Sequence, residues 1–309
     1  MAMIYAKTEM PSILYQYTDI DAFCGIIENN EIWATHWRYL NDKNELRYGF
    51  DQMLFWIQKL KKKKYSSDTQ DFLSQVEKKL SNAPDFLPLE DKDLYIVSLS
   101  KQKDLLSQWR GYGKKYKSVC IGFSTKKMKI SNPLLEWSED YVSWEDEKCT
   151  YKLRKVLYEK NEHIGHTYSL VKFACDDIEK ELKNGKLQKK IEVRVDDFLD
   201  MVTPGLLCIK EPCWKEEKEW RIIVQSSKKD VLHNVKFRKN EYGLVPYIPI
   251  NLSKTTMMDA IHTVFLPKSE NFLLSKKSME MYWKSMMSGE KQKCKHGLKI
   301  NQSKISIVY

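Results

Sequence analysis

The sequence lacks the features that mark several large classes of protein. Glycine and proline are sparse, 11 and 9 among 309 residues, so long disordered linkers are not expected. No stretch approaches the roughly 20 apolar residues that a membrane-spanning helix needs. The segment Met1–Thr8 has no basic stretch followed by an apolar run, so we predict no signal peptide and a cytoplasmic location.

Regular cysteine pairing is also missing. The chain has 7 cysteines, an odd number, and none stands in a Cys-x-x-Cys pair. A secreted disulfide framework or a structural zinc site would show such pairing. Several cysteines have apolar neighbours, as in Val119-Cys120-Ile121 and Leu207-Cys208-Ile209. We interpret them as reduced residues of the core.

The common catalytic and cofactor motifs are absent. There is no phosphate-cradling GxxxxGK[ST], no HExxH and no GxSxG, and Gly111-Tyr112-Gly113 is not followed by the third glycine of a dinucleotide-binding loop. His163 and His166 are three residues apart, but no cysteine or carboxylate has matching spacing. We interpret this pair as a solvated helix face and predict no metal site.

What is present is a globular and basic composition. Hydrophobic residues make up 42% and charged residues 30%, which is enough for a sizeable core, and we predict a single domain over residues 1–309. The formal net charge is +10. Such a surface attracts polyanions such as nucleic acid or nucleotides, although lysine is also the ordinary solubilising residue. Both interpretations stay open.

The pattern of apolar residues predicts strands and helices in irregular alternation. We expect strands over residues 13–18, 31–35, 94–99, 118–123, 150–158, 219–225, 247–250, 261–266 and 304–309. We expect helices over residues 20–28, with Thr18 or Asp19 as N-cap, and over 45–60, 69–81, 105–112, 162–183, 196–207 and 272–287. Without a regular βαβ rhythm, this order predicts an α+β fold with mixed, mainly antiparallel sheets and flanking helices.

Two segments stand apart from this pattern. Residues 61–92 begin with a lysine run, contain a helix of weak core character and end in an acidic loop, so we interpret them as an insertion. Residues 291–303 form a basic segment before the last strand, which is more typical of a solvated tail than of a contact with an anionic partner.

One polar cluster lies at the strand predicted over Glu219–Gln225, which we consider here as beginning at Glu217. Alternation places Glu217, Glu219 and Arg221 on one face and Trp220 on the other. Two carboxylates and a guanidinium are costly to bury without water, a counter-charge or a ligand. The structural alternative is an exposed edge strand with an internal Glu–Arg pair.

Two further clusters have the same double interpretation. Ser98 and Ser100 share a strand face, where their hydroxyls can orient a ribose or can simply end the strand. Tyr15 and Tyr17 share a face near Thr18 and can stack on a nucleobase or pack under the next helix. The remaining clusters favour structure: Leu40–Glu45 is a turn before a helix, and Trp109 and Tyr112 have core-packing spacing in a helix.

Taken in order, these motifs resemble a family of bacterial domains of unknown function. The resemblance runs from the aromatic strand at Leu14 to Leu266. Its motifs are Leu-Asn-Asp-x-x-Glu at Leu40–Glu45, Ser-x-Ser with a later Trp and Tyr-Gly at Ser98–Gly113, Cys-x-Gly-Phe at Cys120–Phe123 and Trp-x-x-Glu-x-Glu-Trp-Arg at Trp214–Arg221.

The order of elements also resembles the ADP-ribosyltransferase superfamily, whose late strand often carries Glu-x-Glu. That resemblance implies an ADP-ribosyltransferase-like core with helical insertions, NAD as a substrate, and Glu219 as the residue that stabilises the ribosyl cation. Glu217 would then orient or deprotonate the acceptor, which would be a protein or nucleic acid, or water in a glycohydrolase. The other implied NAD-binding residues are Ser98, Ser100, Tyr15, Tyr17, Thr18, Tyr112, Arg110 and Arg221. In the opening strand, tyrosines stand where that superfamily has His, Arg or Tyr.

Analogy with such enzymes further implies a toxin or an antiphage defence protein. Two other interpretations remain: a nucleic-acid-binding or processing defence protein without NAD chemistry, and a noncatalytic sensor or interaction module.

Overall fold

The protein is described here by a computed structural model. It describes residues 10–40, 43–81, 94–112, 117–129, 141–145, 149–185, 187–226, 235–240, 243–253, 255–288 and 296–306. The chain divides into two compact units. A helical unit comprises the described parts of Trp37–Leu94 and Val156–Lys215, and a sheet unit comprises the described parts of Tyr5–His36, Tyr95–Lys155 and Glu216–Tyr309.

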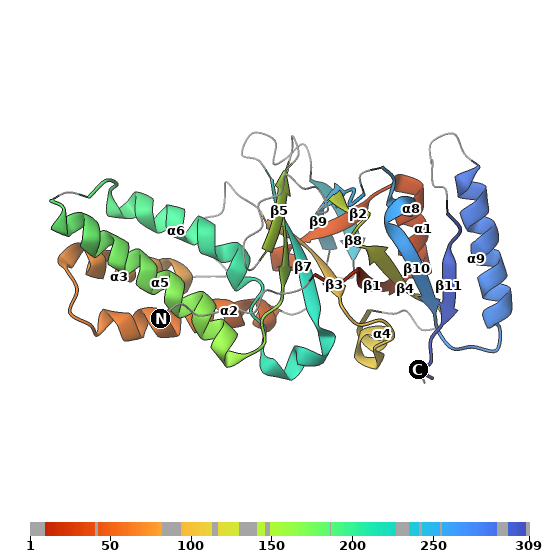
Figure 1. Cartoon of the computed structure of the whole chain (residues 1–309), viewed down its shortest axis with the longest axis horizontal. Coiled ribbons are helices and arrows are strands. Elements are labelled where there is room, and N and C mark those ends of the chain that lie inside the picture. Colours follow the sequence, from red (N-terminus) through yellow and green to blue (C-terminus); the bar gives the residue numbers. More distant parts are fainter. Residues whose placement is uncertain are drawn as a thin grey trace. The chain divides into compact units, whose positions relative to one another are not determined.

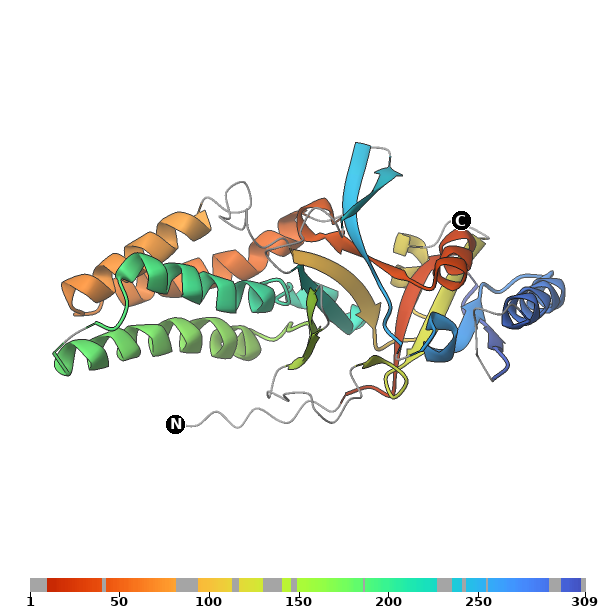
Figure 2. The same cartoon turned by 90° about the horizontal axis from the view of Figure 1, so that it is seen from above.

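Four long helices make up most of the helical unit (Figure 1). They are α2 (Lys43–Lys61), α3 (Ser67–Ser81), α5 (Lys160–Lys183) and α6 (Ile191–Leu206), with the short turns η1 (Trp37–Tyr39) and η4 (Pro212–Glu217) nearby in the chain. In both orientations α5 and α6 lie along α2 and α3 (Figures 1 and 2). Each helix turns an apolar stripe toward the others, which is how an amphipathic helix gains most of its stability.

Two of the sequence interpretations fail in this unit. Helix α3 buries Phe72, Leu73 and Val76 almost completely, so it belongs to the core of the unit and its core character is not weak. His163 is 1% exposed and its ring lies edge-on to Tyr48, so it does not belong to a solvated face. The Nε2 atom of His163 lies 2.9 Å from the carbonyl oxygen of Leu157, and burial lowers the pKa of the imidazole.

Gly49 marks the closest approach of α2 to α6. A Cβ atom at this position would overlap the carbonyl oxygen of Leu206 and lie 2.9 Å from its carbonyl carbon. Gly49→Ala is therefore expected to destabilise the helical unit by about 1–3 kcal/mol, even though alanine is the better helix former. Urea unfolding followed by helical circular dichroism measures this change.

Gly25 in α1 (Ile20–Asn29) provides the matched control. An added Cβ atom there would meet nothing closer than the Asn29 side-chain nitrogen at 3.9 Å. Gly25→Ala is expected to be neutral or to stabilise by up to about 1 kcal/mol. Equal unfolding midpoints for Gly49→Ala and the wild type would contradict the close approach.

The sheet unit contains an open sheet of 11 strands among the described residues. The main path runs β11-β10-β4-β1-β3-β2-β9-β8, and β7 joins it at β3 and continues to β6 and β5. The bounds are β1 (Ile13–Asp19), β2 (Ile32–His36), β3 (Leu94–Ser100), β4 (Ser118–Ser124), β5 (Tyr141–Glu145), β6 (Cys149–Lys155), β7 (Glu219–Ser226), β8 (Lys236–Asn240), β9 (Gly243–Ile250), β10 (Ile261–Leu266) and β11 (Lys299–Gln302). The β10–β11 pair is parallel, whereas β1–β4, β4–β10, β2–β9, β8–β9, β5–β6 and β6–β7 are antiparallel.

Helices cover this sheet unequally on its two faces. The large apolar core joins one face to α1, α8 (Met257–Ala260) and α9 (Phe272–Met287), and includes Phe23 and Trp283. A smaller cluster on the opposite face contains Tyr15, Tyr17 and Trp109, the last from α4 (Leu106–Tyr112). Helices and a mostly antiparallel sheet follow one another without a regular βαβ order, which confirms the predicted α+β class.

Several predicted boundaries need correction. The last strand of the described chain is β11 at Lys299–Gln302, inside the segment that the sequence assigns to a basic tail, whereas residues 304–306 form no strand and 307–309 lie outside the described residues. Helix α6 begins at Ile191, one turn earlier than predicted. Strand β6 ends at Lys155, three residues early. The loop at 82–91 and residues 41–42 of the Leu40–Glu45 turn also lie outside the described residues, and the single domain and the insertion stay predictions.

Within the described residues, none of the helices is long and apolar enough to cross a membrane.

Candidate functional site

Strand alternation brings the predicted site residues of β3 and β7 to one face of the sheet. In β7, Trp220, Ile222 and Val224 belong to the large core, so Glu219 and Arg221 face the other way. In β3, Tyr95, Val97 and Leu99 belong to that core, so Ser98 and Ser100 also face the other way. Because β3 and β7 are neighbours, these four side chains share what we call the polar face.

Glu219 and Arg221 form a buried ion pair on the polar face. The Nε atom of Arg221 donates to Oε1 of Glu219 at 2.8 Å, and Nη2 donates to Oε2 at 3.0 Å. The two residues are 7% and 3% exposed. This fork fixes the plane of the carboxylate, which an isolated surface pair would not do. The predicted internal Glu–Arg pair therefore exists, but β7 lies between β3 and β6 and is not the edge strand of that alternative.

A second guanidinium lies opposite the first. Arg154 of β6 is the antiparallel partner of Arg221, and directly opposed residues project from the same face of a sheet. Arg154 is 8% exposed. Two buried guanidiniums on adjacent strands make this part of the polar face positively charged, which suits an anionic ligand. The sequence analysis missed Arg154, because only the β6–β7 register reveals its position.

Glu217 does not lie on the strand. It ends the turn η4, and the backbone then passes through Lys218 with φ of 43°, a left-handed conformation that interrupts the two-residue alternation. The prediction that Glu217 and Glu219 share a strand face is therefore wrong. Glu217 is nevertheless 7% exposed, so it is a buried carboxylate close in the chain to Glu219.

Ser100 connects the end of β3 to this turn. Its Oγ atom donates to the carbonyl oxygen of Glu217 at 2.6 Å and accepts from the backbone nitrogen of Gln102 at 2.9 Å. The backbone nitrogen of Lys101 also donates a hydrogen bond to the carbonyl oxygen of Lys218 at 3.0 Å. Ser100 therefore positions the chain that leads into Glu219. Ser98 is half-buried on the same face.

The tyrosines of β1 also lie on this side of the sheet, but they are packed. Tyr17 is 6% exposed, its ring lies edge-on to Trp109, and its hydroxyl donates to the carbonyl of Gln102 and accepts from Leu105. Burial raises the pKa of this phenol. Tyr15 is 8% exposed, and Thr18 points to the opposite face with its strand partner Val119. Both tyrosines are packed, but not under the next helix as the structural alternative had it, because α1 covers the other face. Tyr17 lies against Trp109 of α4, and Tyr15 lies edge-on to Phe265 of β10.

Helix α4 turns its two predicted ligand-binding residues outward. Trp109 is fully buried, whereas Arg110 and Tyr112 are exposed, Tyr112 by 45%. The structure therefore does not bring them to Glu219. Cys120 of β4, which packs with Tyr17, is fully buried, and burial raises the pKa of its thiol to about 12.

Asp104 organises the loop before α4. Its backbone φ is 64°, its Oδ1 atom accepts from the indole nitrogen of Trp109 at 2.9 Å and from the hydroxyl of Ser303, and its Oδ2 atom accepts from the backbone of Lys304 at 2.7 Å. These bonds fix the position of Trp109, which in turn supports Tyr17.

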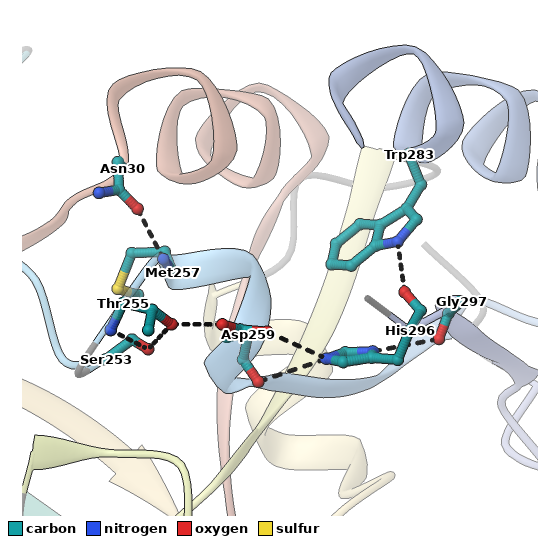
Figure 3. A network of polar contacts seen from close by, with 8 residues as sticks. All are labelled: Asn30, Ser253, Thr255, Met257, Asp259, Trp283, His296 and Gly297. Carbon is teal, nitrogen blue, oxygen red and sulfur yellow. Dashed lines mark hydrogen bonds and ion pairs between the residues drawn. The ribbon is translucent and has the colours of Figure 1, made fainter. Parts of the chain in front are cut away.

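A second polar network involves a histidine that the sequence does not single out (Figure 3). The Nε2 atom of His296 lies 4.0 Å from Oδ1 of Asp259 and 3.4 Å from its carbonyl oxygen. The hydroxyl of Thr255 donates to the same carboxylate, and the indole nitrogen of Trp283 donates to the carbonyl of His296 at 3.2 Å. The hydroxyl contacts the carboxylate rather than the imidazole, so the histidine is not placed to activate it as a nucleophile. The network connects α8, α9 and the chain before β11.

Metal ligation has no support in the described part of the chain. No group of three or more His, Cys, Asp or Glu side chains there could hold a metal ion.

The comparisons identify one segment. Residues 108–222 match the family described as Protein of unknown function (DUF2971). The DUF2971 segment runs from α4 into β7 and contains Arg154, Glu217, Glu219 and Arg221. It is shorter than the resemblance over Leu14–Leu266 and leaves out Ser98 and Ser100. No curated protein and no solved structure matches the chain. The resemblance to ADP-ribosyltransferases stays a prediction.

Proposed function

We propose that the protein cleaves the nicotinamide–ribose bond of NAD and transfers ADP-ribose to an acceptor or to water, with Glu219 as the central catalytic residue. The observation that supports this best is the fork between Glu219 and Arg221 on the polar face, beside Ser98 and Ser100 of the next strand. A carboxylate of fixed orientation in a buried site suits the stabilisation of a cationic sugar.

The proposed reaction follows from this arrangement. The bond between C1′ of the ribose and the ring nitrogen breaks, and nicotinamide leaves as a neutral molecule with the bonding electron pair. The ionised carboxylate of Glu219 stabilises the positive charge that develops on the sugar, as carboxylates do in glycoside cleavage. An acceptor oxygen or nitrogen, or water, then bonds to C1′ and loses its proton to a base, a role that suits Glu217.

The other residues have positioning roles in this proposal. Ser100 holds the turn before β7, and Arg221 orients Glu219. Arg154 contributes positive charge that suits the pyrophosphate of NAD, in the place that the sequence analysis gives to Arg110. Tyr15 and Tyr17 support the strand from within the packed cluster. A role in toxicity or antiphage defence stays a prediction.

The test uses the purified full chain and NAD alone. Calorimetry measures binding, and chromatography measures released nicotinamide. We expect saturable binding and release that scales with protein concentration. No heat of binding at millimolar NAD, together with no release, would overturn the proposal.

A further inference from the structure

On the same side of the sheet as Glu219, an aromatic pair lies at the edge formed by β2, β9 and β8. The rings of Trp33 and Tyr247 are 4.4 Å apart between centroids and 31° from parallel. Tyr247 is buried, whereas Trp33 is 38% exposed. The indole nitrogen of Trp33 donates to Oε1 of Glu31 at 3.0 Å, which fixes the ring in the plane of the stack. A large, oriented and partly exposed ring is a stacking surface.

An arginine accompanies this pair. The guanidinium carbon of Arg238 lies 5.9 Å from the centre of the Trp33 ring, and its Nη2 atom donates to Oγ1 of Thr35 at 3.0 Å. None of the carboxylates that the structure describes pairs with Arg238. Burial lowers the pKa of its guanidinium. Among the described residues, this half-buried cation contacts the Thr35 hydroxyl and the Trp33 ring, so a guanidinium with five N–H donors retains donors for an anion.

The edge strand β8 carries further cations and an exposed aromatic ring. Lys236 and Lys239 are exposed, and Phe237 between them is 59% exposed. Oε2 of Glu31, the acid beside Trp33, lies 3.5 Å from Nζ of Lys236, so that carboxylate is already balanced. The whole chain carries a formal net charge of +10. By strand alternation, Lys236 and Arg238 project from the face of β8 that also carries Tyr247, whereas Phe237 and Lys239 project from the other face. Two cations of the edge strand therefore lie on the side of the aromatic pair.

We infer that this edge, the Trp33 platform of Trp33, Tyr247 and Arg238, binds single-stranded nucleic acid. A base stacks on Trp33, and a phosphate of the same strand is bonded by Arg238, with β8 following the backbone. Single strands present the faces of their bases, whereas a duplex hides them within its own stack. An edge strand with several cations suits a polymer, because it meets successive phosphates, which a free nucleotide does not have.

The test measures fluorescence anisotropy of a labelled oligouridine of about 16 nucleotides, the upper site size of one stacking domain. Trp33→Ala is expected to weaken binding by about tenfold or more through the lost stack. Arg238→Gln is expected to lower the slope of log affinity against log salt by about 0.7, which corresponds to one phosphate contact on a single strand.

Control variants test whether binding depends on the Trp33 platform itself or on any exposed cation or aromatic ring of the protein. Phe173→Ala removes an exposed ring from α5, and Lys277→Ala removes an exposed cation from α9; both should bind like the wild type. Trp33→Leu keeps an apolar side chain over Tyr247 but removes the aromatic ring. We expect it to bind the oligonucleotide more weakly than the wild type while unfolding at the same temperature, which would show that the lost affinity comes from stacking. Three results would overturn the inference: no binding by the wild type at low salt, equal binding by Trp33→Leu and the wild type, or equal affinity for a duplex. Competition by AMP as strong as that by the oligomer would also overturn it, because it would identify a free-nucleotide site.

Discussion

Replacing Arg221 with methionine is expected to destabilise the sheet unit by about 3–5 kcal/mol. The variant keeps much of the side-chain volume but removes both hydrogen bonds that the guanidinium donates to Glu219. Glu219 is 7% exposed, so water cannot replace those donors. A buried carboxylate that loses its partner is far more costly than the pair itself is worth. Chemical unfolding at neutral pH, followed by tryptophan fluorescence, measures the loss.

A double-mutant cycle of Arg221→Met and Glu219→Gln measures the coupling between the two side chains directly. Glu219→Gln in the Arg221→Met background removes the carboxylate charge that has lost these two hydrogen bonds, so the double variant should be more stable than the sum of the single changes by about 1–3 kcal/mol. Arg110→Met is the matched control, because Arg110 is exposed on α4 and should change stability by no more than about 0.5 kcal/mol. Additive effects in the cycle would show that Glu219 and Arg221 are not coupled.

The sequence alone predicts most of the sheet unit and part of the polar face. Helix α1 begins at the predicted cap, where the Asp19 side chain accepts from the backbone of Ala22, and α9 has the predicted bounds. The two-residue period correctly places Glu219 with Arg221 and Ser98 with Ser100, because each pair lies within one uninterrupted strand. The alternation of apolar and polar residues is clear in a strand that buries one of its two faces.

Long-range and single-residue effects escaped that analysis. Glu217 was misplaced because one left-handed residue, Lys218, interrupts the strand pattern, and non-glycine residues rarely adopt that conformation. Arg154 and Arg221 meet only through the β6–β7 register, and Trp33 and Tyr247 through the β2–β9 register. His296 and Asp259 come together from separate segments of the chain. Such pairs have no sequence spacing that a periodic pattern could detect.

Glu219→Gln is expected to reduce the rate of nicotinamide release from NAD by about two to three orders of magnitude. Glutamine preserves the shape of the side chain and one oxygen that can accept from Arg221, so the position of the group should change little. It removes the negative charge that would stabilise the cationic sugar. Because that charge matters most in the transition state, the fall should appear in kcat, with KM and the calorimetric Kd for NAD changing little.

Glu216→Gln separates this effect from the general loss of a carboxylate near β7. Glu216 is exposed on η4, three residues before Glu219, and its substitution should leave nicotinamide release unchanged. Thermal unfolding of both variants shows whether each is folded at the assay temperature. If Glu219→Gln is folded and releases nicotinamide as fast as the wild type and Glu216→Gln, Glu219 is not the catalytic carboxylate. Its fork with Arg221 would then serve the stability of the sheet, a role that the Arg221→Met cycle measures independently of any activity.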